Sequence, residues 1–216
     1  IGKTALRAAD LSAERVRDEI LKTILSDRPE KAALFIEYGL IKKYVPYRAT
    51  TDFTLLKRVK SEREHRLAGF AALFSKAGCE SREILDKLRF SKAEAALCAN
   101  AGCLAAREPS GDSIYVKDTL RTFGEETVKL ALEVQQSIFG ISDMKIYRKI
   151  KEGGECWSRE GLMISPAELI SCGITGRSIG IALDWLLKLV INNPELNEKD
   201  RLKELINNNF GGREYE

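Results

Sequence analysis

Residues 11–29 read LSAERVRDEILKTILSDRP, and their pattern is that of a single amphipathic helix. Ser12 is a good N-cap, because a serine hydroxyl accepts a hydrogen bond from an amide of the first helical turn. Apolar residues then recur at helical spacing and form one stripe, made of Val16, Ile20 and Ile24. Since Pro29 restarts the chain, we predict a helix that begins at Ser12 and ends before that proline.

The helical pattern continues along almost the whole chain. A second helix is predicted to end at Gly39, and an apolar segment, residues 52–77, is predicted to end at Gly78. Ser81 and Ser91 open two further helices, and the second starts with a capping box that pairs Ser91 with Glu94. Small residues that suit close helix packing follow it, namely Ala95, Ala96, Ala99, Ala101 and Gly102.

Later segments strengthen the same prediction. Residues 109–112 read as a loop, and helices are predicted over 127–139 and 142–152. Residues 165–168, Ser-Pro-Ala-Glu, combine an N-cap, a proline at the first helical position and a glutamate two residues later. A strongly apolar helix is expected over 181–191. No alternating strand pattern or hairpin signal is present, so the sequence predicts an all-α fold, with a boundary near 140–154.

Composition excludes several classes of protein. The chain has 216 residues, of which 44% are hydrophobic, which is too many for a disordered chain. It contains no run of 18 apolar residues and no signal peptide, so we expect no membrane span. Because it begins without Met, we expect a processed or excised chain. The five cysteines are spaced irregularly and predict reduced, mostly buried thiols in a cytoplasmic protein rather than disulfides or a zinc site.

Motifs for catalysis are missing. The sequence has no Walker A motif, no dinucleotide-binding glycine pattern and no nucleophile elbow. Its single histidine, His65, lies among charged residues and is predicted to be exposed rather than catalytic. We therefore expect the chain by itself to be inactive, with no metal ligands and no cofactor.

Two stretches are candidates for contact with phosphate. Glycines in the turn 173–180 allow close backbone approach, the following helix presents free N–H groups, and Arg177 adds charge. The same glycines would equally suit a tight corner between two helices, and spacing alone does not decide. Residues 1–66 contain 15 Lys and Arg against 10 Asp and Glu, a net charge of +5, which suits RNA but also suits an ordinary solvated surface.

Residues 11–29, followed by Gly39-Leu40, resemble the neck segment of class II tRNA nucleotidyltransferases, the family of CCA-adding enzymes and bacterial poly(A) polymerases. The stretch Leu88-Arg89-Phe90-Ser91 resembles the start of a helix in the body of that family. Residues 156–197 resemble its tail, although Ser165–Leu169 stands where the family has an Asn-Gly-x-Asp-Leu sequence. The resemblance covers nearly the whole chain.

The resemblance implies an array of helices with a neck over residues 1–50, a body over 51–140 and a tail over 141–216. The catalytic head of the family, which binds Mg²⁺ through paired aspartates, has no counterpart in this sequence. Arg15 and Glu19 match the neck motif, and we expect a bracing role for them. We expect RNA contacts from Arg17, Lys22, Arg28, Lys31, Lys42, Lys43, Gly173, Thr175, Gly176, Arg177, Ser178 and Gly180.

The implied partner is tRNA, held along its acceptor stem and TΨC arm, with no DNA or membrane partner; the oligomeric state is left open. In the intact enzyme these contacts would position the tRNA 3′ end for addition of C and A. Two alternatives remain. The chain is the equivalent part of a poly(A) polymerase or of a partial CC- or A-adding enzyme, or it is a helical protein-interaction module that kept the fold and lost RNA binding.

Overall fold

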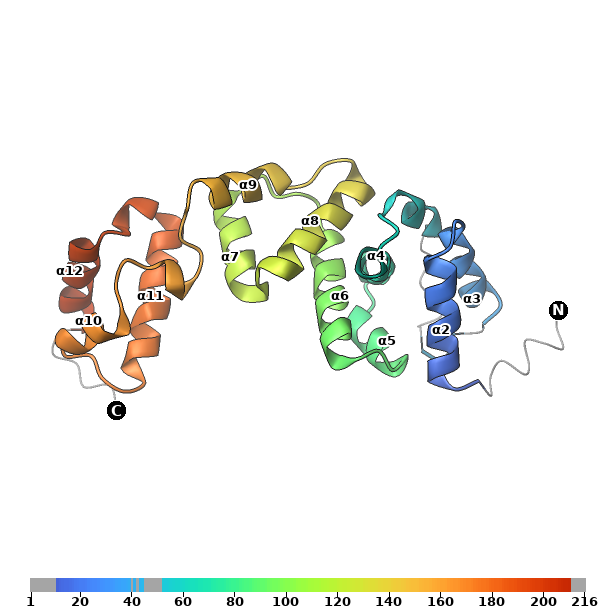
Figure 1. The fold of residues 1–216 in the computed structure, drawn as a ribbon, viewed down its shortest axis with the longest axis horizontal. Coiled ribbons are helices and arrows are strands. Elements are labelled where there is room, and N and C mark those ends of the chain that lie inside the picture. Colours follow the sequence, from blue (N-terminus) through green and yellow to red (C-terminus); the bar gives the residue numbers. More distant parts are fainter. Residues whose placement is uncertain (1–10, 40, 42, 45–51, 211–216) are drawn as a thin grey trace. The chain divides into compact units, whose positions relative to one another are not determined.

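The computed structural model describes residues 11–39, 41, 43–44 and 52–210, and these contain helices and no strand. The all-α prediction is therefore confirmed. The described part of the chain forms two compact units (Figure 1). The first comprises residues 1–110 and 125–144, and the second comprises 111–124 and 145–216. The division into neck, body and tail groups residues differently along the chain and stays a prediction.

The first unit begins with α2 (Ala13–Ile24), which is capped by Ser12 as predicted. A 3-10 helix (Pro29–Ala32) and α3 (Ala33–Glu37) follow, and a second 3-10 helix covers Phe53–Arg58. The remaining helices of this unit are α4 (Arg63–Lys76), α5 (Ser81–Lys87), α6 (Lys92–Ala105) and α8 (Glu125–Phe139).

Helix α4 is the centre of the first unit, seen end-on between α2 and α6 in Figure 1. Residues 66–74 are all buried, so the helix is covered on every side. The rings of Phe70 and Phe74 pack edge to face at 4.8 Å. On another side α6 approaches closely, because Gly102 has no side chain: a Cβ there would lie 2.7 Å from the Ala68 carbonyl oxygen. The small residues of α6 pack as predicted.

A buried arginine joins two helices of this unit. Arg66, on α4, is 7% exposed, and its guanidinium donates to the Ile24 carbonyl at 3.2 Å and to the Lys60 carbonyl at 3.1 Å. The Ile24 carbonyl lies at the C-terminal end of α2, where the helix dipole favours a positive charge. Arg66 thereby fixes α2 against the centre of the unit.

The second unit contains α7 (Ser113–Phe123), α9 (Met144–Glu152), a 3-10 helix (Arg159–Gly161), α10 (Pro166–Ser171) and α11 (Ser178–Asn192). A 3-10 helix (Pro194–Leu196) and α12 (Lys199–Phe210) complete it. Its core lies between α10, α11 and α12, where Leu169, Leu186, Leu202 and Ile206 are fully buried. Trp185 packs edge to face against Phe210 at 5.4 Å.

Three local details differ from the prediction. Helix α7 was not assigned from the sequence, although Asp112 caps it through the Ile114 amide. Helix α11 begins at Ser178 rather than at residue 181, because Gly180 lies inside its first turn instead of before the helix. Ser91 caps α6, but the expected box is incomplete, since the Glu94 carboxylate is bound by Arg63 at 2.6 Å.

Candidate nucleic-acid interface

Two of the predicted RNA-binding lysines lie together in the first unit. Lys22, on α2, and Lys31, in the 3-10 helix before α3, line a groove of about 340 Å³. We call it the α2 groove; its other lining residues are Glu19, Thr23, Ser26, Leu34 and Phe35. Both lysines are exposed. A groove with two ammonium groups and small hydroxyl side chains suits the phosphate and sugar groups of RNA.

Arg17 does not present a free charge to solvent. Its Nη1 donates to the main-chain carbonyl of Arg89 at 2.8 Å, and its Nε donates to the Asp18 carboxylate at 2.9 Å. These contacts orient the guanidinium along the turn between α5 and α6, which is 72 residues away in sequence. Arg17 therefore holds a loop, and its predicted RNA contact stays a prediction.

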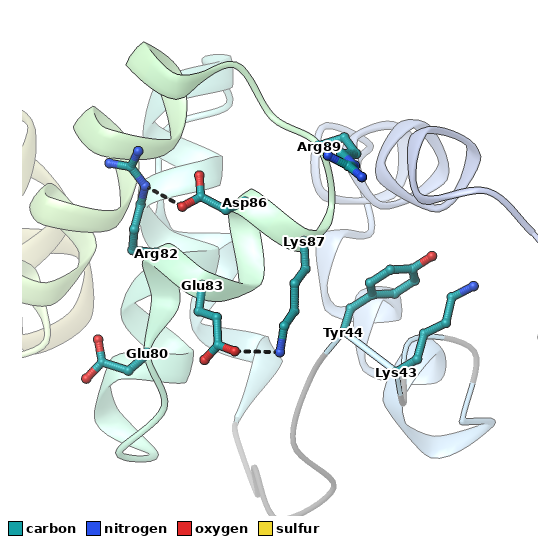
Figure 2. Close-up of a pocket in the computed structure, with 8 residues that line it drawn as sticks. All are labelled: Lys43, Tyr44, Glu80, Arg82, Glu83, Asp86, Lys87 and Arg89. Carbon is teal, nitrogen blue, oxygen red and sulfur yellow. Dashed lines mark hydrogen bonds and ion pairs between the residues drawn. The ribbon is translucent and has the colours of Figure 1, made fainter.

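Lys43 lines a second and larger groove of about 750 Å³. Figure 2 shows Lys43 and Tyr44 on one side of it and the side chains of α5 on the other. We call it the α5 groove; it is lined by Lys43, Tyr44, Glu80, Arg82, Glu83, Asp86, Lys87 and Arg89. The Lys43 ammonium donates to the Leu11 carbonyl at 3.1 Å and lies 4.9 Å from the centre of the Tyr44 ring.

The charges of the α5 groove are mostly neutralised within α5 itself. Arg82 pairs with Asp86 at 2.9 Å and Lys87 pairs with Glu83 at 2.6 Å, and both pairs are four residues apart on the exposed face of the helix. Figure 2 shows both pairs as dashed lines. Arg89 follows the same helix and was not predicted as a binding residue. The sequence analysis used it only within the stretch Leu88–Ser91, which carries part of the family resemblance.

The remaining basic residues are less informative. Arg28 is exposed and lines neither the α2 groove nor the α5 groove. Lys42 lies outside the described residues. Arg15 and Glu19 are both exposed on α2, and Glu19 borders the α2 groove. The structure thus brings Lys22 and Lys31 into one groove and places Lys43 in another.

In the second unit the glycine-rich turn is a tight corner between α10 and α11. Gly173 and Gly176 have φ angles of 86° and 58°, which L-amino acids with a side chain rarely adopt. The Ser178 amide donates to the Thr175 carbonyl at 3.2 Å and the Ile179 amide donates to the Gly176 carbonyl at 3.4 Å. Two of the amides that were expected to face a phosphate are therefore used inside the turn.

Other features of this turn remain compatible with an anion. Thr175, Gly176 and Arg177 are exposed, and Arg177 stands at the N-cap of α11, whose dipole favours a negative charge. Gly180 lies in the first turn of α11, and a Cβ built there meets no atom within 4 Å. The arrangement favours the structural explanation for the glycines and leaves the Arg177 side chain as the stronger candidate for a ligand contact.

His65 is less exposed than predicted. Its side chain is 17% exposed, and Nε2 lies 2.7 Å from a Glu133 carboxylate oxygen, which also accepts a hydrogen bond from Lys60. Burial alone would raise the pKa of Glu133, but the hydrogen bonds from Lys60 and His65 outweigh it, and this pKa lies below its usual value. The cluster links α4 to α8 and is explained by packing.

The two buried cysteines are poorly suited to react as nucleophiles. All five are free thiols, as predicted, but only Cys98 and Cys156 are buried; Cys79 and Cys172 are intermediate and Cys103 is exposed. Burial raises the pKa of the Cys98 thiol to about 12 and also raises that of Cys156. The described part of the chain brings together no three His, Cys, Asp or Glu residues in a way that suits a metal ion. Every helix in those same residues is too short or too polar to cross a bilayer.

Comparison with known proteins gives one match. Residues 1–51 match the family model described as "Probable RNA and SrmB- binding site of polymerase A". Helices α2 and α3, and with them the α2 groove, fall inside this segment. The match relates the N-terminal part of the chain to the polymerase A family at a coarse level and supports RNA as its partner. No curated protein and no solved structure matches the chain.

Proposed function

We propose that this chain is the tRNA-binding portion of a CCA-adding tRNA nucleotidyltransferase, which holds the acceptor stem and TΨC arm while C and A are added to the 3′ end. The observation that carries the proposal is the match of residues 1–51 to an RNA-binding family segment, with Lys22 and Lys31 lining one groove inside it. The cytoplasm is the proposed location.

Such binding depends on electrostatic attraction to the phosphates and on the shape of the RNA duplex. A duplex of A-form RNA offers its phosphates and 2′-hydroxyl groups rather than its base edges, so exposed lysine and arginine side chains are the appropriate ligands. The described residues do not fit a Mg²⁺ site, since no suitable cluster of carboxylates is present among them. In this proposal the metal and the nucleotide triphosphates belong to a catalytic head elsewhere in the intact protein, and this chain contributes binding alone.

The test is binding of the chain to a minihelix of the tRNA acceptor stem and TΨC arm across a salt series. We expect the logarithm of the association constant to fall linearly with the logarithm of the salt concentration, by about 0.9 per phosphate contact. An unrelated RNA duplex of equal length should bind more weakly at every salt concentration. Equal binding of the two duplexes would contradict tRNA specificity.

A paired variant tests the α2 groove. Replacing Lys22 and Lys31 by glutamine should lower the salt slope by about 2, one unit for each phosphate contact. Lys129→Gln is the matched control, because Lys129 is an exposed lysine of α8 in the same unit and outside both grooves. If the double variant binds the minihelix like the control, the α2 groove is not the RNA site.

One specific observation favours a second candidate. The matching family segment is described for polymerase A, which makes the equivalent part of a poly(A) polymerase the main rival. That protein would prefer a single-stranded oligo(A) to the minihelix, and direct competition between the two RNAs decides. A protein-interaction module would bind neither RNA with a salt-dependent slope.

A further inference from the structure

Arg89 is an exposed arginine whose charge is not neutralised within the described structure. The two cations of α5, Arg82 and Lys87, each form an ion pair with a carboxylate of the same helix, whereas Arg89, which follows the helix, has no carboxylate within 4.0 Å among the described residues. Its charge also acts on Glu14. The pKa of Glu14 is lowered mainly by a hydrogen bond from its own backbone amide, and electrostatic attraction to Arg89 lowers it further by a smaller amount.

The main chain of Arg89 adopts a conformation that favours glycine. Its φ is 61°, and it is the one residue other than glycine with a positive φ in the described part of the chain, where eight glycines share that feature. It follows α5 and closes the helix, with the Arg89 amide donating to Asp86 and the Phe90 amide donating to Leu85. Glycine would close the helix here without strain. Strained residues of this kind are concentrated at functional sites, so the arginine needs an explanation beyond the turn.

A second residue holds Arg89 in place. The Arg17 guanidinium on α2 donates to the Arg89 carbonyl at 2.8 Å, while Asp18 fixes the other edge of that guanidinium. The bond reaches the main chain of Arg89 and leaves its side chain unengaged. Arg17 thus sets where the Arg89 side chain emerges at the α5 groove. Figure 2 shows Arg89 at the top of the view, above Tyr44 and Lys43, which also line this groove.

We propose that Arg89 binds a backbone phosphate of RNA at the edge of the α5 groove, and that Arg17 is the residue that positions it. A guanidinium is a planar fork of donors that matches two phosphate oxygens, and phosphate is the anion that RNA presents at every nucleotide. The acidic residues of α5 limit this groove to one such contact, because their carboxylates would repel a path of successive phosphates. The inference rests on the proposed RNA-binding function and adds a site outside the matched segment 1–51.

The decisive variant is Arg89→Gly, which removes the side chain and suits the backbone. Wild type and variant are titrated with the same minihelix over the salt series. Because glycine prefers the positive φ, we expect the variant to melt at the same temperature or higher, and to bind RNA roughly three- to tenfold more weakly with a salt slope lower by about 0.9. Loss of binding together with higher stability separates a ligand contact from a structural role.

Two further variants complete the experiment. Arg89→Lys keeps the charge and should retain most of the salt slope, with weaker binding from loss of the fork. Lys129→Gln removes an exposed cation of the same unit that lies outside both grooves, and should change the slope little. If wild type shows no salt-dependent RNA binding, the proposed function fails; if wild type binds and Arg89→Gly binds equally well, the role of Arg89 alone is overturned.

Discussion

The turn after α5 in the first unit and the turn after α10 in the second are built in the same way. Each helix ends in a residue with positive φ, Arg89 at 61° and Gly173 at 86°. The next amide donates to the carbonyl five residues back, from Phe90 to Leu85 and from Ile174 to Leu169, and all four of these side chains are buried. This is the Schellman type of helix ending, in which the hydrogen bond to the carbonyl five residues back is accompanied by an apolar contact between the two side chains.

The difference between the turns lies in the residue at the positive φ. Gly173 has the conformation that glycine adopts freely, so the turn in the second unit needs no explanation beyond its geometry. Arg89 has a positive φ that is strained for a residue with a side chain, and its carbonyl accepts a hydrogen bond from Arg17 on α2. Glycines in a corner are therefore a weaker indication of ligand binding than an arginine in a place that favours glycine. The turn 173–180, for which spacing alone did not decide between a ligand site and a corner, is the one that the structure explains most simply.

The largest effect is expected when an arginine, the residue at the positive φ of the first turn, is placed at Gly173 in the second turn. Gly173→Arg should destabilise the second unit by about 1–2 kcal/mol, since a side chain at positive φ meets its own backbone. A Cβ at this position meets no other atom within 4 Å, so the cost is that of the backbone alone. Both tryptophans, Trp157 and Trp185, belong to the second unit, and urea titration by tryptophan fluorescence measures its unfolding.

The outcome of that exchange bears on the comparison directly. Gly173→Ala serves as the control, because it adds the same backbone strain without a charge and should cost a similar free energy. If Gly173→Arg were neutral while Gly173→Ala were destabilising, the arginine side chain would be compensating for the strain. The strain at Arg89 would then need no ligand to explain it.

The reciprocal exchange should stabilise. Arg89→Gly is expected to raise the unfolding free energy of the first unit by about 0.5–1 kcal/mol, because it relieves the positive φ. The Cys98 thiol, buried in α6 of that unit with a pKa raised to about 12, reports on the opening of the unit when its alkylation is followed by peptide mass spectrometry. Slower alkylation than in wild type is the expected result, and faster alkylation would mean that the Arg89 side chain stabilises the fold.

Much of the fold could be predicted from the sequence because its signals are local. The caps at Ser12 and Ser165 and the helix ends at Gly39, Gly78 and Gly173 each depend on a few neighbouring residues, and the structure places them as expected. Helix α7 was missed because it lies between a loop signal at 109–112 and Gly124, directly before α8, so its pattern is short and its ends are unremarkable.

The remaining details depend on partners that are far away in sequence. The box at Ser91 is incomplete because Arg63, from α4, takes the Glu94 carboxylate. His65 is partly buried because Glu133 comes from α8. The role of Arg17 was also hidden, since its acceptor is a carbonyl 72 residues away that belongs to no recognisable motif. Periodicity and capping rules contain no information on such contacts.

A smaller effect is expected at Gly180, which separates the two explanations of the turn 173–180. Gly180 lies in the first turn of α11, and a Cβ added there would meet no atom within 4 Å, so Gly180→Ala should stabilise the second unit by about 0.5 kcal/mol. If the glycine is only part of a corner, the minihelix affinity stays unchanged, as measured by the same salt series. A marked loss of affinity with full stability would show that a ligand approaches the backbone here, and would favour the phosphate-binding explanation of this turn.

The smallest effect concerns the other end of α10, where Ser165 and Glu168 form the complete capping box that α6 lacks. Hydrogen bonds from Lys199, and then from the Ser165 backbone and hydroxyl, lower the pKa of Glu168 from 4.5 to about 2. A carboxyl group whose pKa is lower in the folded state contributes its stabilisation above pH 4.5 and loses it as the pH falls towards 2.

Urea midpoints read by tryptophan fluorescence should therefore fall over this range in wild type and fall less in Glu168→Gln. Lys199→Gln removes the main cause of the low pKa of Glu168. The folded-state pKa of Glu168 should then rise, so the loss of stability should be complete at a higher pH than in wild type. Because the Glu168 side chain is only partly buried, added salt should weaken the effect as well. An equal pH dependence in wild type and Glu168→Gln would show that α10 is held by its buried Leu169 and by the Gly173 turn, and that the box at its start adds little.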